Sequence, residues 1–557
     1  MLLPSDRAYG SSLPRAVLGL GVVLALGAAP GCFSTDNGPE PPEHALYFPT
    51  AIVASPGGNV LYVINSDFDL QYKAGTVQAL DLGRIRTMMP KLGTGADPTA
   101  ACKLARLERQ QPQDALLYPG ACTAVDIDNP QQGGGQLVKA TAHIGAFATD
   151  AALALKPCAV GPMVSGGPAE PPCSGARLMI PVRGDPSLTW IDVDDDRKAT
   201  SSAFRLECGQ QPGSPVCADD HKAGIDPNEN TRSLTMPSEP FSVAISDDTT
   251  AVVVSHQTTG TASLILNDWA TGPKLSFVLG GLPTGVTGVL SFPKPQLAIE
   301  QPAAYPYQPG FLLSFRTSAE VDVLRYYDDA AASPSRPFIA RTARIGISTN
   351  ATGFDSRGVA IDTRERRRAE GNCPTAEGAE RTSCLQSAAG VPVAAFAANR
   401  VPPSLLIGQT TTNASIYGTD DSVFFFDSVP LSQGPSRVYV AQVWDPIAGV
   451  AKTRVFIVCF DARLLYVYDP DARAMEAVVQ TGRGPTALAF DPLLGQDPST
   501  HQALPPGAAE PAVSAAYAYL THFTDSYLGV LDLDMSHSSY LTIIGSVGVP
   551  MPPRESK

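Results

Sequence analysis

The sequence has little positive charge, and what it has is not clustered. Lys and Arg number 40 against 54 Asp and Glu, which gives a net charge of -14. No run of basic residues reverses this balance locally. Because an acidic surface repels phosphate backbones, we expect no nucleic acid among the partners of this protein.

The sequence also lacks the motifs that mark common catalytic and cofactor sites. It contains no Walker A loop, no GxSxG elbow, no GxGxxG opening a helix, no HExxH and no CxxCH. The acidic segments "DVDDDRK" and "SDDTT" have no spacing typical of calcium loops, so solvated turns are the better interpretation. The sequence therefore predicts no cofactor and no metal, although catalysis without a known motif stays open.

The composition is rich in turn-forming residues. The 49 Gly and 51 Pro exceed average usage, while the hydrophobic content of 44% excludes wholesale disorder. We therefore expect a folded chain with many turns and few long helices.

The N-terminus has the three parts of a bacterial secretory signal. Arg7 and Arg15 precede the apolar run Ala16–Ala29, and small residues then lead to Cys32. The run has roughly 14 residues, whereas a membrane span needs about 20. A cleaved signal is thus favoured over a transmembrane helix.

The end of this segment resembles a bacterial lipoprotein signal. Gly31 and Cys32 match the lipobox, while Ala29 and Pro30 depart from it. The resemblance implies that residues 1–31 are removed and that Cys32 is lipidated. It also implies an outer-membrane lipoprotein on the periplasmic or surface face, which contacts the membrane only through its lipid. The polar, Pro-rich residues 32–44 are expected to be a flexible tether.

The remaining cysteines agree with export. Eight of them fall into four local pairs within loop-like stretches, where a disulfide would close a short loop. Metal ligation is the weaker interpretation, because there is no CxxC and no His at ligand spacing. Cys459 lies inside an apolar run and is expected to be a buried free thiol. The four expected disulfides are Cys102–Cys122, Cys158–Cys173, Cys208–Cys217 and Cys373–Cys384.

One short unit of three strands recurs along the chain. Its clearest copy is "PTAIVASPGGNVLYVIN", followed by "GTVQALDL", with a turn signal between the first two apolar runs. Related copies follow, giving about seven units that start near residues 49, 144, 240, 311, 356, 436 and 484, and the copy from residue 311 keeps only the second and third strands. Repetition of a small antiparallel unit of this length is typical of a β-propeller.

The clearest copy resembles the YVTN-type propeller repeat. In that repeat a Pro precedes an apolar strand, a Ser-Pro-Asp-Gly turn, "LYVxN" and a Val-rich strand ending in Asp. The resemblance implies an all-β, seven-bladed β-propeller of four-stranded antiparallel blades in residues 45–557. The surplus length must form long loop insertions, which carry the cysteine pairs. Because the last strand near Tyr540–Pro550 meets no further repeat, we expect the N- and C-terminal strands to close the ring; an open solenoid is the alternative.

Equivalent positions in the blades predict a binding site. The loop after the second strand and the link into the next blade should open onto one face, around the channel mouth. Arg side chains around this mouth would bind a carboxylate, a phosphate or an anionic glycan through paired hydrogen bonds. The residues at the end of each second strand are Asn65, Arg183, His256, Arg316, Arg400 and His522, with Phe460 and Asp461 in the sixth copy.

These residues also have a purely structural interpretation. Arg at blade ends often pairs with nearby Asp, and a lone His is more often structural than catalytic. Our first hypothesis is an exported, lipid-anchored binding or assembly module whose partner is an envelope protein, an anionic small molecule or a glycan. The alternative is a propeller enzyme of the lactonase or quinone-dependent dehydrogenase type, since fold alone does not decide function.

Overall fold

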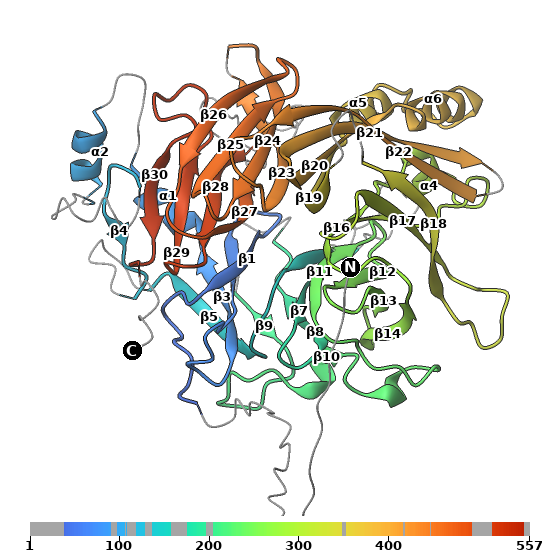
Figure 1. Ribbon diagram of the computed structural model, residues 1–557, viewed down its shortest axis with the longest axis horizontal. Helices are drawn as coiled ribbons and strands as arrows, with labels where there is room; N and C mark the ends of the chain where they lie inside the picture. Colours follow the sequence, from blue (N-terminus) through green and yellow to red (C-terminus); the bar gives the residue numbers. More distant parts are fainter. Residues whose placement is uncertain are drawn as a thin grey trace, which may run out of the picture.

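The computed structural model contains seven antiparallel sheets arranged as the blades of a β-propeller (Figure 1). It describes residues 38–90, 97–105, 107, 119–128, 136–156, 175–196, 204–347, 353–415, 418–445, 447–492 and 515–550. The expected fold class, with seven blades of four antiparallel strands, is confirmed.

The first three blades follow the chain in order, each from an inner strand to an outer one. Blade 1 comprises β1 (Pro49–Ala54), β2 (Val60–Asn65), β3 (Gly75–Asp81) and β5 (Val138–Ile144). Blade 2 comprises β6 (Ala152–Leu155), β7 (Ala176–Val182), β8 (Ser187–Val193) and β10 (Lys222–Ala223), and β9 (Leu206–Glu207) also pairs with β8. Blade 3 comprises β11 (Pro240–Ile245), β12 (Ala251–His256), β13 (Thr261–Asp268) and β14 (Gly272–Leu279).

The other four blades repeat this order. Blade 4 comprises β15 (Val286–Ser291), β16 (Gly310–Phe315), β17 (Glu320–Tyr327) and β18 (Phe338–Gly346). Blade 5 comprises β19 (Phe354–Asp362), β20 (Val393–Val401), β21 (Pro403–Ser415) and β22 (Gly418–Pro430). Blade 6 comprises β23 (Arg437–Asp445), β24 (Val450–Cys459), β25 (Leu464–Asp469) and β26 (Ala474–Gln480). Blade 7 comprises β27 (Pro485–Pro492), β28 (Ala515–His522), β29 (Tyr527–Asp532) and β30 (Ile543–Val547).

Helices occur only in the insertions of the described chain. Next to blade 1 are α1 (Leu82–Met88) and α2 (Pro98–Leu104). The group formed by α4 (Gln296–Glu300), α5 (Arg364–Gly371) and α6 (Ala379–Ala389) packs beside β21 (Figure 1). Of two short 3₁₀ helices, Asp219–His221 lies just before β10 within blade 2, and Pro227–Glu229 lies in the connection between blades 2 and 3.

The core lies between the blades. A buried apolar cluster fills each of the seven junctions between neighbouring blades. Each cluster forms because the two sheet faces that meet at the junction both present apolar side chains. The cluster between blades 7 and 1, for example, includes Leu61, Val63, Tyr519 and Val530. This junction is packed like the other six, so the ring is closed.

The N- and C-terminal segments meet at this junction. The short strand β4 (Ala124–Val125), from the insertion of blade 1, pairs in parallel with β30 as a fifth strand of blade 7. Near the channel, β1 lies beside β27 (Figure 1), and the Thr486 hydroxyl donates to the carbonyl of Pro49 at 3.2 Å. Each blade nevertheless supplies its own four strands, and the closure is a contact between complete blades.

Three of the four expected disulfides are confirmed. They are Cys102–Cys122, Cys208–Cys217 and Cys373–Cys384, with Cα–Cα distances of 5.2, 5.0 and 5.6 Å. Cys32, Cys158 and Cys173 lie outside the described residues. Cys459 is a buried free thiol at the end of β24, and burial raises its pKa to about 12.

Candidate functional site

The channel mouth is built from two kinds of loop that interlock around the ring. Ser66, in the loop after β2, donates its N–H to the carbonyl of Phe48 at 3.1 Å and accepts from the N–H of Phe147 at 2.7 Å. Arg183, after β7, then donates to Phe147 at 3.2 Å. The same pattern of backbone hydrogen bonds continues in blades 3 and 4. There the N–H of Gln257 donates to the carbonyl of Glu239, that of Gly285 to Gln257, and that of Arg316 to Gly285. Backbone hydrogen bonds thus fix the residues of this face from blade to blade.

Asn65, the first member of the predicted column, is buried at the end of β2. Its side chain is 2% exposed and accepts from the N–H of Tyr47 at 3.1 Å. Its amide donates to Thr76 at 3.0 Å and to Gln78 at 3.2 Å. Within the described chain its amide is therefore occupied in joining β2, β3 and the N-terminal segment.

The two histidines of the column are buried and neutral. The Nδ1 of His256 lies 3.1 Å from the carbonyl of Ser238, and its Nε2 lies 2.8 Å from the hydroxyl of Ser263. The ring of His522 stacks on that of Tyr527 at 4.2 Å. Burial lowers the pKa of His256 to about 4 and that of His522 to about 3. Neither ring adds positive charge to the mouth at neutral pH.

Arg183 forms a separate ion pair in this face. Its Nη2 lies 2.7 Å from Oε2 of Glu239, which precedes the inner strand of blade 3. The pair links blades 2 and 3 and neutralises both charges.

Arg316 and Arg400 do come together, and they do so around a third arginine. Nη2 of Arg357 donates to Oδ2 of Asp355 at 2.9 Å, while Nε of Arg316 lies 3.9 Å from Oδ1 of Asp355. Arg400 forms an ion pair with Asp461 of the next blade. Burial, followed by the positive charges of Arg357 and Arg316, lowers the pKa of Arg400. We call Arg316, Arg357 and Arg400 the arginine cluster.

Gly434 packs closely against the side chain of Arg400. A Cβ atom at Gly434 would lie 2.7 Å from its Cγ atom, so only glycine fits there without a shift of the arginine.

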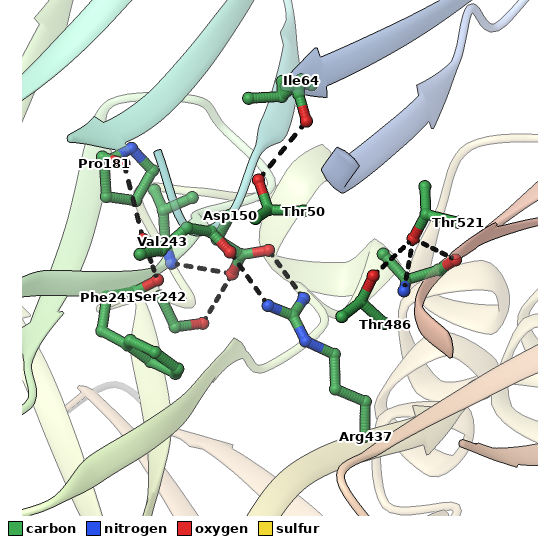
Figure 2. Close-up of polar contacts among 12 residues, drawn as sticks. Thr50, Ile64, Asp150, Pro181, Phe241, Ser242, Val243, Arg437, Thr486 and Thr521 are labelled. Carbon is green, nitrogen blue, oxygen red and sulfur yellow. Dashed lines mark hydrogen bonds and ion pairs between the residues drawn. The ribbon is translucent and has the colours of Figure 1, made fainter. Parts of the chain in front are cut away.

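A second column, which the sequence analysis missed, lines the channel itself. It consists of the residues at the start of each inner strand, where five of the seven blades contain a β-bulge or other irregularity of register. A bulge turns side chains away from the regular alternation of the strand. Figure 2 shows several of these residues around the channel. The column contains Thr50, Asp150, Ser242, Thr287, Arg357, Arg437 and Thr486.

Arg437 and Asp150 form an ion pair across the channel, from blade 6 to blade 2 (Figure 2). Nη1 of Arg437 lies 2.9 Å from Oδ1 of Asp150, and its Nη2 donates to the carbonyl of Thr149 at 3.1 Å. The other carboxylate oxygen accepts from the hydroxyl of Ser242 at 2.7 Å and from the N–H of Val243 at 3.3 Å. Burial alone would lower the pKa of Arg437, but the charge of Asp150 outweighs it and holds this pKa above its ordinary value.

A cavity of about 330 Å³ adjoins this pair. Its wall is formed by the inner strands of blades 2 to 6 and includes Asp150, Ser242, Arg357, Arg437 and Tyr439. Arg357 belongs both to this wall and to the arginine cluster, so the cavity and the cluster are neighbours. The polar part of the wall offers guanidinium, hydroxyl and phenol groups to a ligand.

Among the residues that the structure describes, no group of three or more His, Cys, Asp or Glu side chains is placed to hold a metal ion. Within the same residues, every helix is too short or too polar to cross a bilayer.

Comparisons with known proteins identify no family for this chain. No family model matches it, and no curated protein matches it. Solved structures that match include a protein of Bacteroides uniformis named as a candidate 6-phosphogluconolactonase (11% identity, 77% of this chain, 83% of that chain, TM-score 0.38). They also include hydrazine synthase of Kuenenia stuttgartiensis (12% identity, 88% and 97%, TM-score 0.41). Identities and TM-scores this low bear on neither activity nor ligand.

Proposed function

We propose that this propeller is a binding module that recognises a small anion at its channel mouth and performs no covalent chemistry. The observation that carries this proposal is the gathering of Arg316, Arg357 and Arg400 from blades 4 and 5, of which Arg316 and Arg357 share the carboxylate of Asp355.

The charges of this cluster do not cancel. Within the described part of the chain, three guanidinium groups face two carboxylates, those of Asp355 and Asp461, which leaves one positive charge in excess. Repulsion from its neighbours contributes to the lowered pKa of Arg400, and a bound anion would relieve that repulsion. Guanidinium groups also bind carboxylates and phosphates through paired hydrogen bonds, which supports an anion of this kind as the ligand.

The alternative, an enzyme of the lactonase or quinone-dependent dehydrogenase type, requires carboxylates that are available for proton transfer or metal binding. Asp150 is held by Arg437 and Ser242, and Asp355 is held by Arg357. Carboxylates that are tied to arginines in this way are poor general bases, so at these two residues anion binding is better supported than proton transfer. Turnover of a lactone, abolished by Asp150→Asn, would favour the enzyme instead.

Binding can be tested with citrate and with inorganic phosphate as probes. We expect isothermal titration at low salt to show citrate binding, weakened about tenfold by Arg316→Gln because a charge-assisted hydrogen bond is lost. Arg473→Gln is the matched control, since it removes the same charge from an exposed loop of blade 6 between β25 and β26. Absence of binding by the unmodified protein, or equal losses in both variants, would overturn the proposal.

We further propose that the module is exported and lipid-anchored at Cys32, at the bacterial cell envelope. The basic residues, the apolar run and the lipobox-like Gly31–Cys32 support this location. Mass spectrometry of the protein from its native host should find an N-terminal lipid-modified Cys32. An unmodified peptide that spans residues 28–33 would refute the anchor without affecting the binding proposal.

A further inference from the structure

The N-terminal segment is held on blade 1 from Gly38 onward, and it leaves the fold at the channel-mouth face. The carbonyl of Pro39 accepts from the N–H of Lys73 at 3.1 Å, and Glu40 forms an ion pair with the side chain of Lys73. A Cβ atom at Gly38 would lie 2.9 Å from the backbone nitrogen of Lys73, so Gly38 contacts the same residue. Because Lys73 belongs to the loop between β2 and β3, which opens onto the mouth, the chain toward Cys32 departs from this face.

The length of the chain before Gly38 limits how far the mouth face can stand from a membrane. Cys32, the proposed site of the lipid, lies six residues before Gly38. A fully extended chain spans at most about 3.6 Å per residue, so the lipid is attached within roughly 20 Å of this face. A bilayer that holds the lipid is therefore close to the channel mouth at blade 1.

Exposed apolar side chains lie on the mouth face in two blades that are not neighbours. In blade 1, Phe68 is 51% exposed in the loop between β2 and β3, and its ring lies 5.2 Å from that of Phe523. In blade 5, Phe354 and Val401 are 51% and 41% exposed. These two residues pair with each other where β19 begins and β20 ends, which is the mouth end of the blade. Apolar side chains exposed in this way mark surfaces that meet a membrane or a partner.

The arginine cluster lies beside the apolar pair of blade 5. Val401 follows Arg400 in the chain, and Phe354 precedes Asp355, the carboxylate that the other two arginines of the cluster share. Within the described residues the cluster has an excess positive charge, which attracts anionic lipids. Guanidinium groups bind phosphates, and apolar side chains next to them can enter the boundary between headgroups and acyl chains. Blade 5 thus offers both kinds of contact to an anionic bilayer.

We propose that the channel-mouth face docks on a lipid bilayer. Phe68, Phe354 and Val401 then lie at the membrane interface, and the arginine cluster lies at the level of the lipid phosphates. This inference rests on the proposed lipid anchor and adds a second contact between the protein and the membrane. A planar bilayer extends over the whole face, so it contacts blades 1 and 5 at the same time although they are apart in the ring. Docking fixes the orientation of the ring, which a lipid on a short chain alone would leave free.

The test measures how close introduced tryptophans come to the membrane. The lipidated protein is placed on vesicles of phosphatidylethanolamine and phosphatidylglycerol, with or without a doxyl-labelled lipid that quenches tryptophan at short range. We expect Phe68→Trp and Phe354→Trp each to add fluorescence that the labelled lipid quenches, beyond that of the unmodified protein.

Phe424→Trp is the matched control for these variants. Phe424 is 62% exposed on β22, so its replacement also adds a tryptophan at the surface. It lies six residues before Pro430, the mouth end of that strand, which corresponds to about 20 Å. The fluorescence that Phe424→Trp adds should therefore not be quenched.

A second measurement tests the contact of the arginine cluster with lipid phosphates. Addition of Arg316→Gln to the Phe354→Trp protein should reduce its quenching on vesicles that contain phosphatidylglycerol, because one attractive charge is lost. Arg473→Gln, which removes the same charge from the turn between β25 and β26 on the opposite face, should leave the quenching unchanged. Equal quenching in these two proteins would show that the cluster does not contact the lipids.

The outcomes separate this inference from the proposed function. Quenching in Phe68→Trp alone would mean that the protein rests on the edge of blade 1, and quenching in none of the variants, or equally in Phe424→Trp, would mean that the mouth does not dock. Each of these results overturns the inference without affecting citrate binding. If Cys32 carries no lipid, the anchor and the docking fail together and the anion site stands. If quenching occurs as expected but citrate does not bind, the docking stands and the small-anion proposal fails.

Discussion

Arg437 and Asp150 are 287 residues apart in the chain, and their side chains meet across the channel at 2.9 Å. This contact joins blade 6 directly to blade 2 and bypasses the two blades that lie between them around the ring. It is a cross-brace in addition to the seven junctions between neighbouring blades.

The cross-brace predicts a stability loss in Arg437→Met. This variant leaves the carboxylate of Asp150 without its cation in a site where only 14% of the side chain is exposed. Removal of one partner from a largely buried pair costs about 3 kcal/mol. Urea denaturation should therefore show a lower midpoint with an unchanged slope.

The double variant Arg437→Met/Asp150→Asn is the control for this prediction. It removes both charges and should recover much of the lost stability. A single variant as stable as the unmodified protein would show that the pair does not brace the ring.

The disulfide Cys102–Cys122 is predicted to support closure of the ring. It lies two residues before β4, the strand that pairs with β30 of the last blade. Replacement of both cysteines by serine should cost about 3 kcal/mol, the value expected for a loop of this size, and should increase hydrogen exchange in β30.

The comparison for this variant is the double serine replacement of Cys373 and Cys384, which lie in the helical insertion of blade 5. That change should leave exchange in β30 unaltered. Equal exchange of β30 in both variants would contradict a role for Cys102–Cys122 in closure.

Asp67, at the channel mouth, predicts a pH-dependent loss of stability. Burial raises its pKa from 3.8 to about 7, so the folded state favours the protonated form. Its contribution is fully present below pH 3.8 and is lost as the pH rises through about 7. The Asp67→Asn variant should have the same melting temperature as the unmodified protein at pH 4. At pH 8 its melting temperature should be higher than that of the unmodified protein.

Asn is a suitable replacement at this position because Asp67 has a φ of 49°, a left-handed conformation that Asn tolerates. Identical melting temperatures at pH 8 would show that Asp67 carries no burial penalty.

His256 predicts a dependence of the opposite sign. Its pKa falls from 6.5 to about 4 on folding, because burial disfavours the charged ring. Its contribution is present above pH 6.5 and is lost as the pH falls toward 4, since the unfolded chain then binds the proton more readily. His256→Gln should flatten the fall in the free energy of unfolding between pH 6.5 and 4. An unchanged slope would show that another group causes it.

Much of the fold was predictable because the repeat recurs with its turns. The copy at Pro49–Leu82 predicted β1, β2 and β3, and the copies from Pro240 and Gly484 predicted the inner strands of blades 3 and 7. Outer strands such as β14 and β26 were not identified individually, because they are partly exposed and their apolar pattern is weak. Cysteine spacing predicted the three disulfides because each closes a short loop.

The site was less predictable. The column at the end of the second strands led to Arg316 and Arg400, but Arg357 and Arg437 lie at the start of inner strands. At Arg357 a bulge interrupts the alternation of side chains in β19, so a period-two pattern does not show that this residue lines the channel. The ion pair between Arg437 and Asp150 also depends on ring diameter and blade order, which the local sequence does not contain. Alignment of the inner strands by their first residues would have revealed this column.

The pairing of β4 with β30 also bears on biosynthesis. Because every blade uses its own consecutive strands, blade 1 is complete once residue 144 has left the ribosome and need not wait for the C-terminus. The ring, in contrast, becomes complete only when β30 emerges at residues 543–547 and reaches β4, which was synthesised some 400 residues earlier. Until then β4 has no sheet partner and blade 1 presents an uncovered apolar face. The nascent chain would therefore need protection from aggregation during most of its synthesis.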